Sequence, residues 1–219
     1  MGRVTRVLIV DDDPLVRSAL SLMMGGQPDI EVVGEAADGR AGLDLVADLR
    51  PDVVLIDIRM PVMDGLEATR RLQEQESPPA VVVLTTFDAD DHVVSALASG
   101  ADGFLLKDTP PGDIVAAVRS VAAGDAMLSP SAIRSLVSRL RQDASVDRVA
   151  SATTRLATLT DREREVAVCV GRGLSNSEVA RELHLSVPTV KSHVSRLFTK
   201  LQSTNRVQVA MVVHDAGLV

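Results

Sequence analysis

The chain has 219 residues, enough for one large domain or two small ones. Hydrophobic residues make up 46% and charged residues 24%, which is typical of globular proteins and excludes a wholly disordered chain. Aromatic residues make up only 1%, so stacking on bases cannot be a main way of binding nucleic acid. The single cysteine, Cys169, excludes an intramolecular disulfide and a zinc site built from cysteines.

The net charge of −7 conceals an asymmetry along the chain. Residues 1–122 carry 10 basic and 21 acidic residues, whereas residues 123–219 carry 13 basic and 9 acidic ones. This division predicts two domains with different partners. The first apolar stretch is too short for a signal peptide and no apolar run is long enough to span a membrane, so we expect a soluble cytoplasmic protein.

The first half of the chain alternates strand and helix patterns. Short apolar runs lie at 6–10, 30–34, 53–57, 80–85 and 103–106, as expected for parallel strands buried on both faces. Amphipathic stretches follow them at 15–24, 39–49, 65–74, 90–98 and 113–123. This order predicts an α/β domain over residues 1–123, a (βα)5 doubly wound parallel sheet.

The segment 124–154 has a different composition and is predicted to be a linker. Ile133, Leu136, Val137 and Leu140 have helical spacing, which predicts an amphipathic linker helix. Residues 142–154 are small and polar, and we expect them to form a flexible tether.

Residues 155–219 show no strand pattern and predict a compact all-α domain of four helices. Thr160 with Glu163, and Ser175 with Glu178, fit the capping box that begins a helix. Ser186 is placed to cap a third helix, and a fourth fits residues 206–216.

Polar side chains follow four of the five predicted strands. They are Asp11, Asp12 and Asp13 after the first strand, Asp57 at the third, Thr85 at the fourth and Lys107 after the fifth. Because ligands bind at the carboxyl ends of parallel strands, we expect these groups to form one site. Carboxylates held close together repel one another and need a cation, and oxygen ligands that leave room for water suit Mg²⁺. The sequence therefore predicts a Mg²⁺-dependent phosphoryl site with Asp57 as nucleophile and with Thr85 and Lys107 on the phosphoryl oxygens.

Each of these residues also has an ordinary structural interpretation. Asp13 precedes Pro14 and could simply cap the first helix, and a lone lysine after a strand is usually solvated. Lys107 is, however, one of only three lysines beside twenty arginines. Phe104 by itself would be an ordinary core residue.

The acid pair Asp11-Asp12, the run 57–65 (DIRMPVMDG), Thr85 and Lys107 together resemble the receiver domain of two-component response regulators, over about residues 4–122. The resemblance implies that Asp57 accepts a phosphoryl group from a phosphohistidine on a sensor histidine kinase. A receiver only assists its own phosphorylation and dephosphorylation, so the chain is not expected to be an enzyme.

The same resemblance implies a ligand set and a switch. Asp12 and Asp57 would bind Mg²⁺ directly, Asp11 would act through water, and the Arg59 backbone carbonyl would supply another ligand. Thr85 and Phe104 would form the switch: Thr85 moves toward the phosphoryl group and Phe104 turns inward. Arg59 and Phe87 flank the site and are bulky, at positions that tune phosphoryl lifetime in this family.

A short helix, a tight turn and a longer helix over residues 176–201 predict a helix-turn-helix. Val190, Val194, Leu197 and Leu201 repeat at helical spacing and should face the core. The opposite face is polar and suits the DNA major groove, although a polar helix face is more often simply solvated.

Three segments, 159–166, 173–180 and 186–194, together with Asn205-Arg206, resemble the LuxR-type DNA-binding domain over about residues 155–219. The resemblance places Lys191, Ser192 and Ser195 near bases and Ser175, Asn176, Thr189 and His193 near phosphates. Arg196 and Lys200 extend the polar side of the second helix toward the DNA backbone.

With the receiver, this domain places the chain in the NarL/FixJ class of response regulators. We expect phosphorylation of Asp57 to control promoter binding, with a homodimer contacting two half-sites about one helical turn (~34–36 Å) or a multiple of it apart. One alternative is a regulator that uses the receiver only for dimerisation. Another is a phosphatase, because residues 7–15 loosely resemble the first motif of haloacid-dehalogenase-type enzymes.

Overall fold

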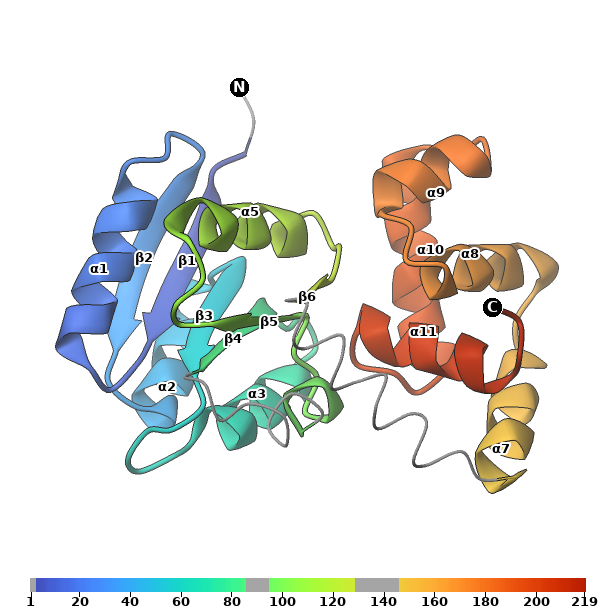
Figure 1. The fold of residues 1–219 in the computed structure, drawn as a ribbon, viewed down its shortest axis with the longest axis horizontal. Helices are drawn as coiled ribbons and strands as arrows, with labels where there is room; N and C mark the ends of the chain where they lie inside the picture. The colour runs from blue at the N-terminus through green and yellow to red at the C-terminus, as the bar shows by residue number, and fades with distance from the viewer. Residues whose placement is uncertain (1–2, 86–94, 129–145) are drawn as a thin grey trace. The chain divides into compact units, whose positions relative to one another are not determined.

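The structure is a computed structural model that describes residues 3–85, 95–128 and 146–219. The chain divides into two compact units, residues 1–135 and 136–219 (Figure 1). The predicted linker helix around Ile133 and Leu140 lies outside the described residues, as do Phe87 and the first part of the helix predicted at 90–98.

The first unit is built on a parallel sheet with the strand order β2-β1-β3-β4-β5-β6. The strands are β1 (Thr5–Val10), β2 (Ile30–Ala36), β3 (Val53–Asp57), β4 (Ala80–Thr85), β5 (Gly103–Leu106) and β6 (Met127–Leu128). The central strands β1, β3 and β4 are almost wholly buried, because helices cover both faces of a parallel sheet. The apolar runs predicted five of these strands, whereas β6 has two residues and no apolar run marks it.

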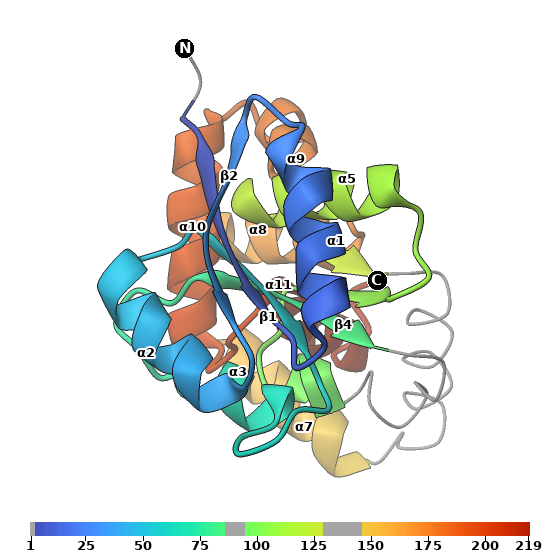
Figure 2. The ribbon, with the colours of Figure 1, turned by 90° about the vertical axis from the view of Figure 1, so that its left-hand side faces the viewer.

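Four helices of this unit are described in full: α1 (Pro14–Gly25), α2 (Gly39–Leu49), α3 (Gly65–Gln73) and α5 (Pro111–Ala122). Leu20 and Met24 of α1 and Ile114 and Val118 of α5 share one aliphatic core against the sheet. α2 and α3 contact each other on the opposite face (Figure 2). The predicted doubly wound α/β sheet is therefore confirmed.

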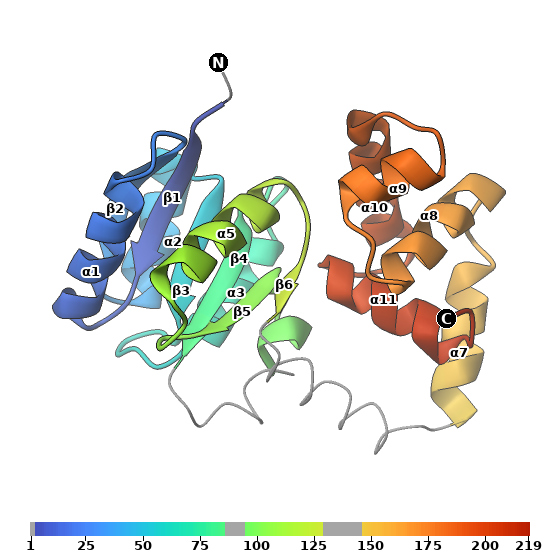
Figure 3. The same cartoon turned by 45° about the horizontal axis from the view of Figure 1, so that its top comes forward.

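The described part of the second unit is all-helical. Its helices are α7 (Val146–Leu156), α8 (Asp161–Gly171), α9 (Asn176–Glu182), α10 (Val187–Lys200) and α11 (Arg206–Asp215) (Figure 3). Their common core is aliphatic and includes Val166, Val190, Leu197 and Val213. Both predicted capping boxes are present, so side chains satisfy backbone amides at the start of α8 and of α9.

The flexible tether predicted over 142–154 is wrong where the structure describes it. Residues 146–156 form α7, which packs against α11. Ala152 and Leu156 lie four residues apart on one face of the helix and are buried in the helical core. The hydroxyls of Thr153 and Thr154 donate to carbonyls four residues earlier, so their polar groups are satisfied within the helix.

Candidate functional site

The side chains of Asp11, Asp57 and Lys107 meet at the carboxyl edge of the sheet, where β4 also ends in Thr85. Asp11 follows β1, Asp57 ends β3, Thr85 ends β4 and Lys107 follows β5. Thr85 is paired in register with the last residue of β5, and its carbonyl accepts a hydrogen bond from the Lys107 amide at 2.7 Å. Parallel strands therefore deliver these groups to one place, as the sequence pattern predicts.

Lys107 bridges two buried carboxylates. Its Nζ lies 2.7 Å from Asp11 Oδ2 and 3.1 Å from Asp57 Oδ2, and the two aspartate side chains are 1% and 8% exposed. Burial raises the pKa of Asp57 above its usual value, and the hydrogen bond from Lys107 opposes this shift. Burial alone would lower the pKa of Lys107, but its hydrogen bonds with the two carboxylates outweigh that effect and the pKa is raised. The ammonium group therefore stays charged between the two acids.

The acid cluster of Asp11, Asp12 and Asp57 has a donor set that fits a divalent cation. One carboxylate oxygen from each residue lies within 4.8 Å of the others, and Asp12 is exposed. Three carboxylates beside a single ammonium leave an excess of negative charge, and oxygen donors open to water on one side suit Mg²⁺. Arg59 follows two residues after Asp57 at an exposed position, and ligation through its carbonyl stays a prediction.

Gly65 is required by the close approach of the loop after β3. A Cβ atom at this position would lie 2.0 Å from the Asp57 carbonyl oxygen, closer than any two such atoms can approach. The Gly65 amide donates to the Ile58 carbonyl at 2.9 Å. These contacts hold the start of α3 against the strand end that carries Asp57.

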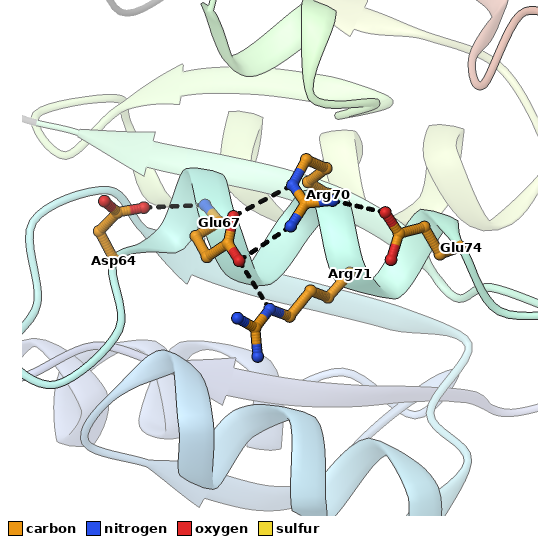
Figure 4. Close-up of polar contacts among 5 residues, drawn as sticks. All are labelled: Asp64, Glu67, Arg70, Arg71 and Glu74. Atoms are coloured by element: carbon orange, nitrogen blue, oxygen red, sulfur yellow. Dashed lines mark hydrogen bonds and ion pairs between the residues drawn. The ribbon is translucent and has the colours of Figure 1, made fainter.

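The first turn of α3 is stabilised by polar contacts that lie outside the acid cluster. Asp64 caps the helix by accepting from the Glu67 amide at 2.8 Å, and Glu67 lies between Arg70 and Arg71 (Figure 4). Hydrogen bonds from the two arginines lower the pKa of Glu67 to about 2. Glu67 is therefore an ion-paired carboxylate that supports its own helix.

Two other predicted side chains take ordinary structural positions. Asp13 caps α1 by accepting from the Leu15 amide at 2.8 Å, which is the capping interpretation left open by the sequence. Phe104 lies on β5 opposite Val83 and is 0% exposed. The structure thus has Phe104 already inside the core, and an inward rotation on phosphorylation stays a prediction.

The second unit presents a polar helix face on α10. Val190, Val194 and Leu197 are buried, whereas the opposite face is exposed and carries Lys191, Ser192, Ser195 and Arg196. Ser186 caps the helix and its Oγ lies 2.7 Å from the Oγ1 of the exposed Thr189. This division leaves the predicted base-contacting side chains accessible.

Two predicted DNA contacts are engaged within the protein. Lys200 Nζ lies 2.7 Å from Glu163 Oε2, and Glu163 is buried at the start of α8. Asn176 is 2% exposed, and its Oδ1 accepts from Arg206 at 2.9 Å. These bonds compete with contacts to DNA, and DNA contacts through Lys200 and Asn176 stay predictions. Glu163 is 37 residues from Lys200 in the sequence, and Arg206 is 30 residues from Asn176. A local sequence pattern could not have indicated these partners.

Ser175 and His193, which are also predicted to contact phosphates, are partly covered by the protein. Ser175 is half-buried and caps α9, where it both donates to Glu178 and accepts from its amide. His193 is half-buried, and its Nδ1 is fully covered and has no hydrogen-bond partner among the described residues. His193 could therefore offer a polar group to DNA only through its other ring nitrogen.

Comparison with known proteins assigns both units. Residues 7–119 match the family model described as "Response regulator receiver domain", and residues 157–213 match "Bacterial regulatory proteins, luxR family". The chain belongs to the LuxR family of response regulators. This family consists of DNA-binding regulators of transcription, and the phosphatase alternative is overturned because the receiver match contains the whole acid cluster.

Relatives of this response regulator match it over nearly its whole length. The transcriptional regulatory protein LiaR of Bacillus subtilis is 38% identical over 216 residues, which cover 98% of this chain and 99% of LiaR. The nitrate/nitrite response regulator NarL of Escherichia coli is 37% identical over 211 residues, 95% of this chain and 94% of NarL.

Solved structures give the same assignment. ChrA, a response regulator of a heme-sensing two-component system, is 32% identical with a TM-score of 0.54, and the match covers 100% of both chains. The receiver domain of the putative NarL of Mycobacterium tuberculosis is 40% identical with a TM-score of 0.54, and covers 56% of this chain and 99% of that one. Within the described part of this response regulator, each helix is too short or too polar to cross a membrane.

Proposed function

We propose that this response regulator accepts a phosphoryl group on Asp57 from a sensor histidine kinase, and that this reaction controls binding of its LuxR-type domain to promoter DNA. The observation that carries the proposal is the Lys107 ammonium held between two buried carboxylates at the sheet edge, beside a third. We also propose that the protein is cytoplasmic, because the cytoplasm holds the promoter DNA that its LuxR-type domain would bind.

In the proposed transfer, an Asp57 carboxylate oxygen attacks the phosphorus of a phosphohistidine, and the imidazole nitrogen leaves as the P–N bond breaks. Asp11, Asp12 and Asp57 would hold Mg²⁺, which neutralises the negative charge of the phosphoryl oxygens. Lys107 lies 3.1 Å from Asp57, so its ammonium can follow the phosphoryl group and pair with one of its oxygens. Thr85, at the end of β4, offers a hydroxyl from the neighbouring strand.

The proposed DNA contacts separate into two kinds. Lys191, Ser192 and Ser195 would contact base edges in the major groove, and Lys191 has the only long side chain of the three. Ser175, Thr189, His193 and Arg196 would contact phosphates and fix the register. Phosphorylated chains would bind as a homodimer to paired half-sites.

The test is Mg²⁺-dependent labelling of the full chain by acetyl phosphate, measured as the intact mass. We expect the wild-type chain to gain one phosphoryl group and Asp57→Asn to gain none. Full labelling of Asp57→Asn would move the nucleophile elsewhere and contradict the proposal. Phosphorylation that leaves DNA affinity unchanged would instead favour a receiver that serves only for dimerisation.

A further inference from the structure

Arg17 forms a polar network on the backbone of the acid pair Asp11-Asp12. From α1, its Nη1 donates to the backbone carbonyl of Asp11 at 2.7 Å and to that of Asp12 at 3.2 Å. Its Nε lies 3.4 Å from Glu35 Oε2, near the carboxyl end of β2. Ser21 donates to the other Glu35 oxygen at 2.6 Å. One guanidinium thus connects β2 and α1 to the two peptides that carry the acid pair.

These contacts restrain the two peptides from which the acidic side chains project. β1 ends at Val10, and the Asp11 amide still donates to the Ala36 carbonyl of β2. Beyond that amide, hydrogen bonds between strands no longer restrain the backbone. The Asp11 side chain also accepts from the Asp13 amide at 3.0 Å, so the turn is tight. A planar guanidinium can bond two successive carbonyls in fixed directions, which a lysine cannot do equally well. Arg17 is 18% exposed along its side chain, so water replaces these bonds only in part.

The charge of Arg17 requires a counter-charge. A lone cation behind the acid cluster would repel a divalent ion on its other side. Glu35 pairs with Arg17 and makes the network close to neutral, so the hydrogen bonds act on the acid pair without a large opposing field.

We infer that Arg17 is a positioning residue for the metal ligands Asp11 and Asp12, and that Glu35 neutralises it in that role. This inference rests on the proposed function, because it assumes that the acid cluster binds a divalent cation. Loss of a side chain that orients metal ligands typically weakens metal binding by about tenfold or more.

The experiment titrates the full chain with Mn²⁺, counts the free ion by its EPR signal, and competes the bound ion with Mg²⁺. We expect Arg17→Met to weaken Mn²⁺ binding by about tenfold and Arg17→Lys to give an intermediate affinity. The matched control is Arg119→Met, which removes a bidentate arginine–aspartate pair with Asp29 at the amino edge of the same sheet. The control should bind Mn²⁺ like the wild-type chain.

The outcomes separate the inference from the proposed function. A wild-type chain that binds no Mn²⁺ contradicts the proposed function itself. Equal Mn²⁺ affinity in the wild-type chain and in Arg17→Met overturns the inference. An equal loss of Mn²⁺ affinity in Arg119→Met also overturns it, because the effect would then reflect the stability of the whole receiver. If Arg17→Met does not fold, Arg17→Lys decides, and a wild-type affinity in that variant overturns the inference.

Glu35→Gln tests the part played by charge. The variant keeps the arginine and its carbonyl bonds but leaves the cation without its partner, so Mn²⁺ binding should weaken through repulsion. Because salt screens this repulsion, the loss should shrink between about 0.05 M and 0.5 M NaCl. A loss that is the same at both salt concentrations would show that Glu35 acts by geometry and would contradict its neutralising role.

Discussion

The two units of this response regulator present charge in opposite ways. The receiver buries two carboxylates, 1% and 8% exposed, around one ammonium at a sheet edge. The helical unit instead exposes a row of polar side chains along α10, whose other face is core. In the first site short contacts hold Lys107 and the two buried carboxylates, whereas in the second Lys191, Ser192 and Arg196 are exposed to a partner.

This difference predicts how each site responds to change. Interactions between buried charges are strong and weakly screened, so single substitutions in the receiver should have large effects that depend little on salt. An exposed helix face that binds DNA gains its affinity from many contacts and from counterion release. Substitutions there should have smaller effects and a marked dependence on salt.

The largest effect is expected for Lys107→Met. The variant removes the cation between Asp11 and Asp57, and with it the ammonium that we propose pairs with a phosphoryl oxygen. The rate of Mg²⁺-dependent labelling by acetyl phosphate should fall by about a hundredfold or more. Lys191→Ala is the control from the other unit and should be labelled at the wild-type rate. Equal losses in both variants would contradict the separation of the two sites.

Gly65→Ala should destabilise the receiver through strain at the phosphoacceptor. The new Cβ would meet the Asp57 carbonyl oxygen, and relieving that contact requires the backbone to move. We expect a loss of about 1–3 kcal/mol in the free energy of unfolding, measured by denaturant titration. Gly112→Ala is the control, because its added Cβ would meet no described heavy atom within 4 Å apart from its chain neighbours and the backbone of its own helix. That variant should match or exceed wild-type stability, and an equal loss in both would refute the packing argument.

Lys191→Ala should weaken specific DNA binding by about 1–3 kcal/mol if the side chain contacts a base. Lys200→Ala should have a smaller effect and leave the salt dependence of binding nearly unchanged, because Glu163 already neutralises Lys200. The DNA affinity of each variant and its salt dependence are measured from binding curves at several salt concentrations. The DNA is an operator selected from a random-sequence pool. If Lys200→Ala reduces the slope of the logarithm of the binding constant against the logarithm of salt concentration by about one, then Lys200 leaves Glu163 to contact a phosphate.

The smallest effect concerns the pH dependence of the helical unit. The hydrogen bond from Lys200, aided by the Thr160 amide, lowers the pKa of Glu163 from its usual value of 4.5 to about 2. A carboxylate whose pKa is lower in the folded state stabilises the fold above its unfolded pKa, and this stabilisation is lost as pH falls from about 4.5 to 2. NMR titration of the Glu163 carboxyl carbon should give the low pKa, and Lys200→Ala should raise it. An unperturbed pKa in the wild-type chain would contradict the pair.

Local patterns predicted most of the fold and the acid cluster for the same physical reason. Apolar runs mark buried parallel strands, and parallel strands must bring Asp11, Asp57 and Lys107 to one edge. The same patterns could not predict the pairing of Lys200 with Glu163, because it depends on how α8 and α10 pack. They also missed α7, of which Ala152 and Leu156 are the buried apolar side chains among those described.

The most direct test of the account joins the two units in one measurement. The affinity of the full chain for its selected operator is determined at fixed salt with Mg²⁺, with and without acetyl phosphate, for the wild-type chain and Asp57→Asn. The account predicts that acetyl phosphate raises the affinity of the wild-type chain and leaves that of Asp57→Asn unchanged. If acetyl phosphate leaves the affinity of the wild-type chain unchanged, or changes it equally in the wild-type chain and in Asp57→Asn, control of DNA binding through Asp57 is contradicted.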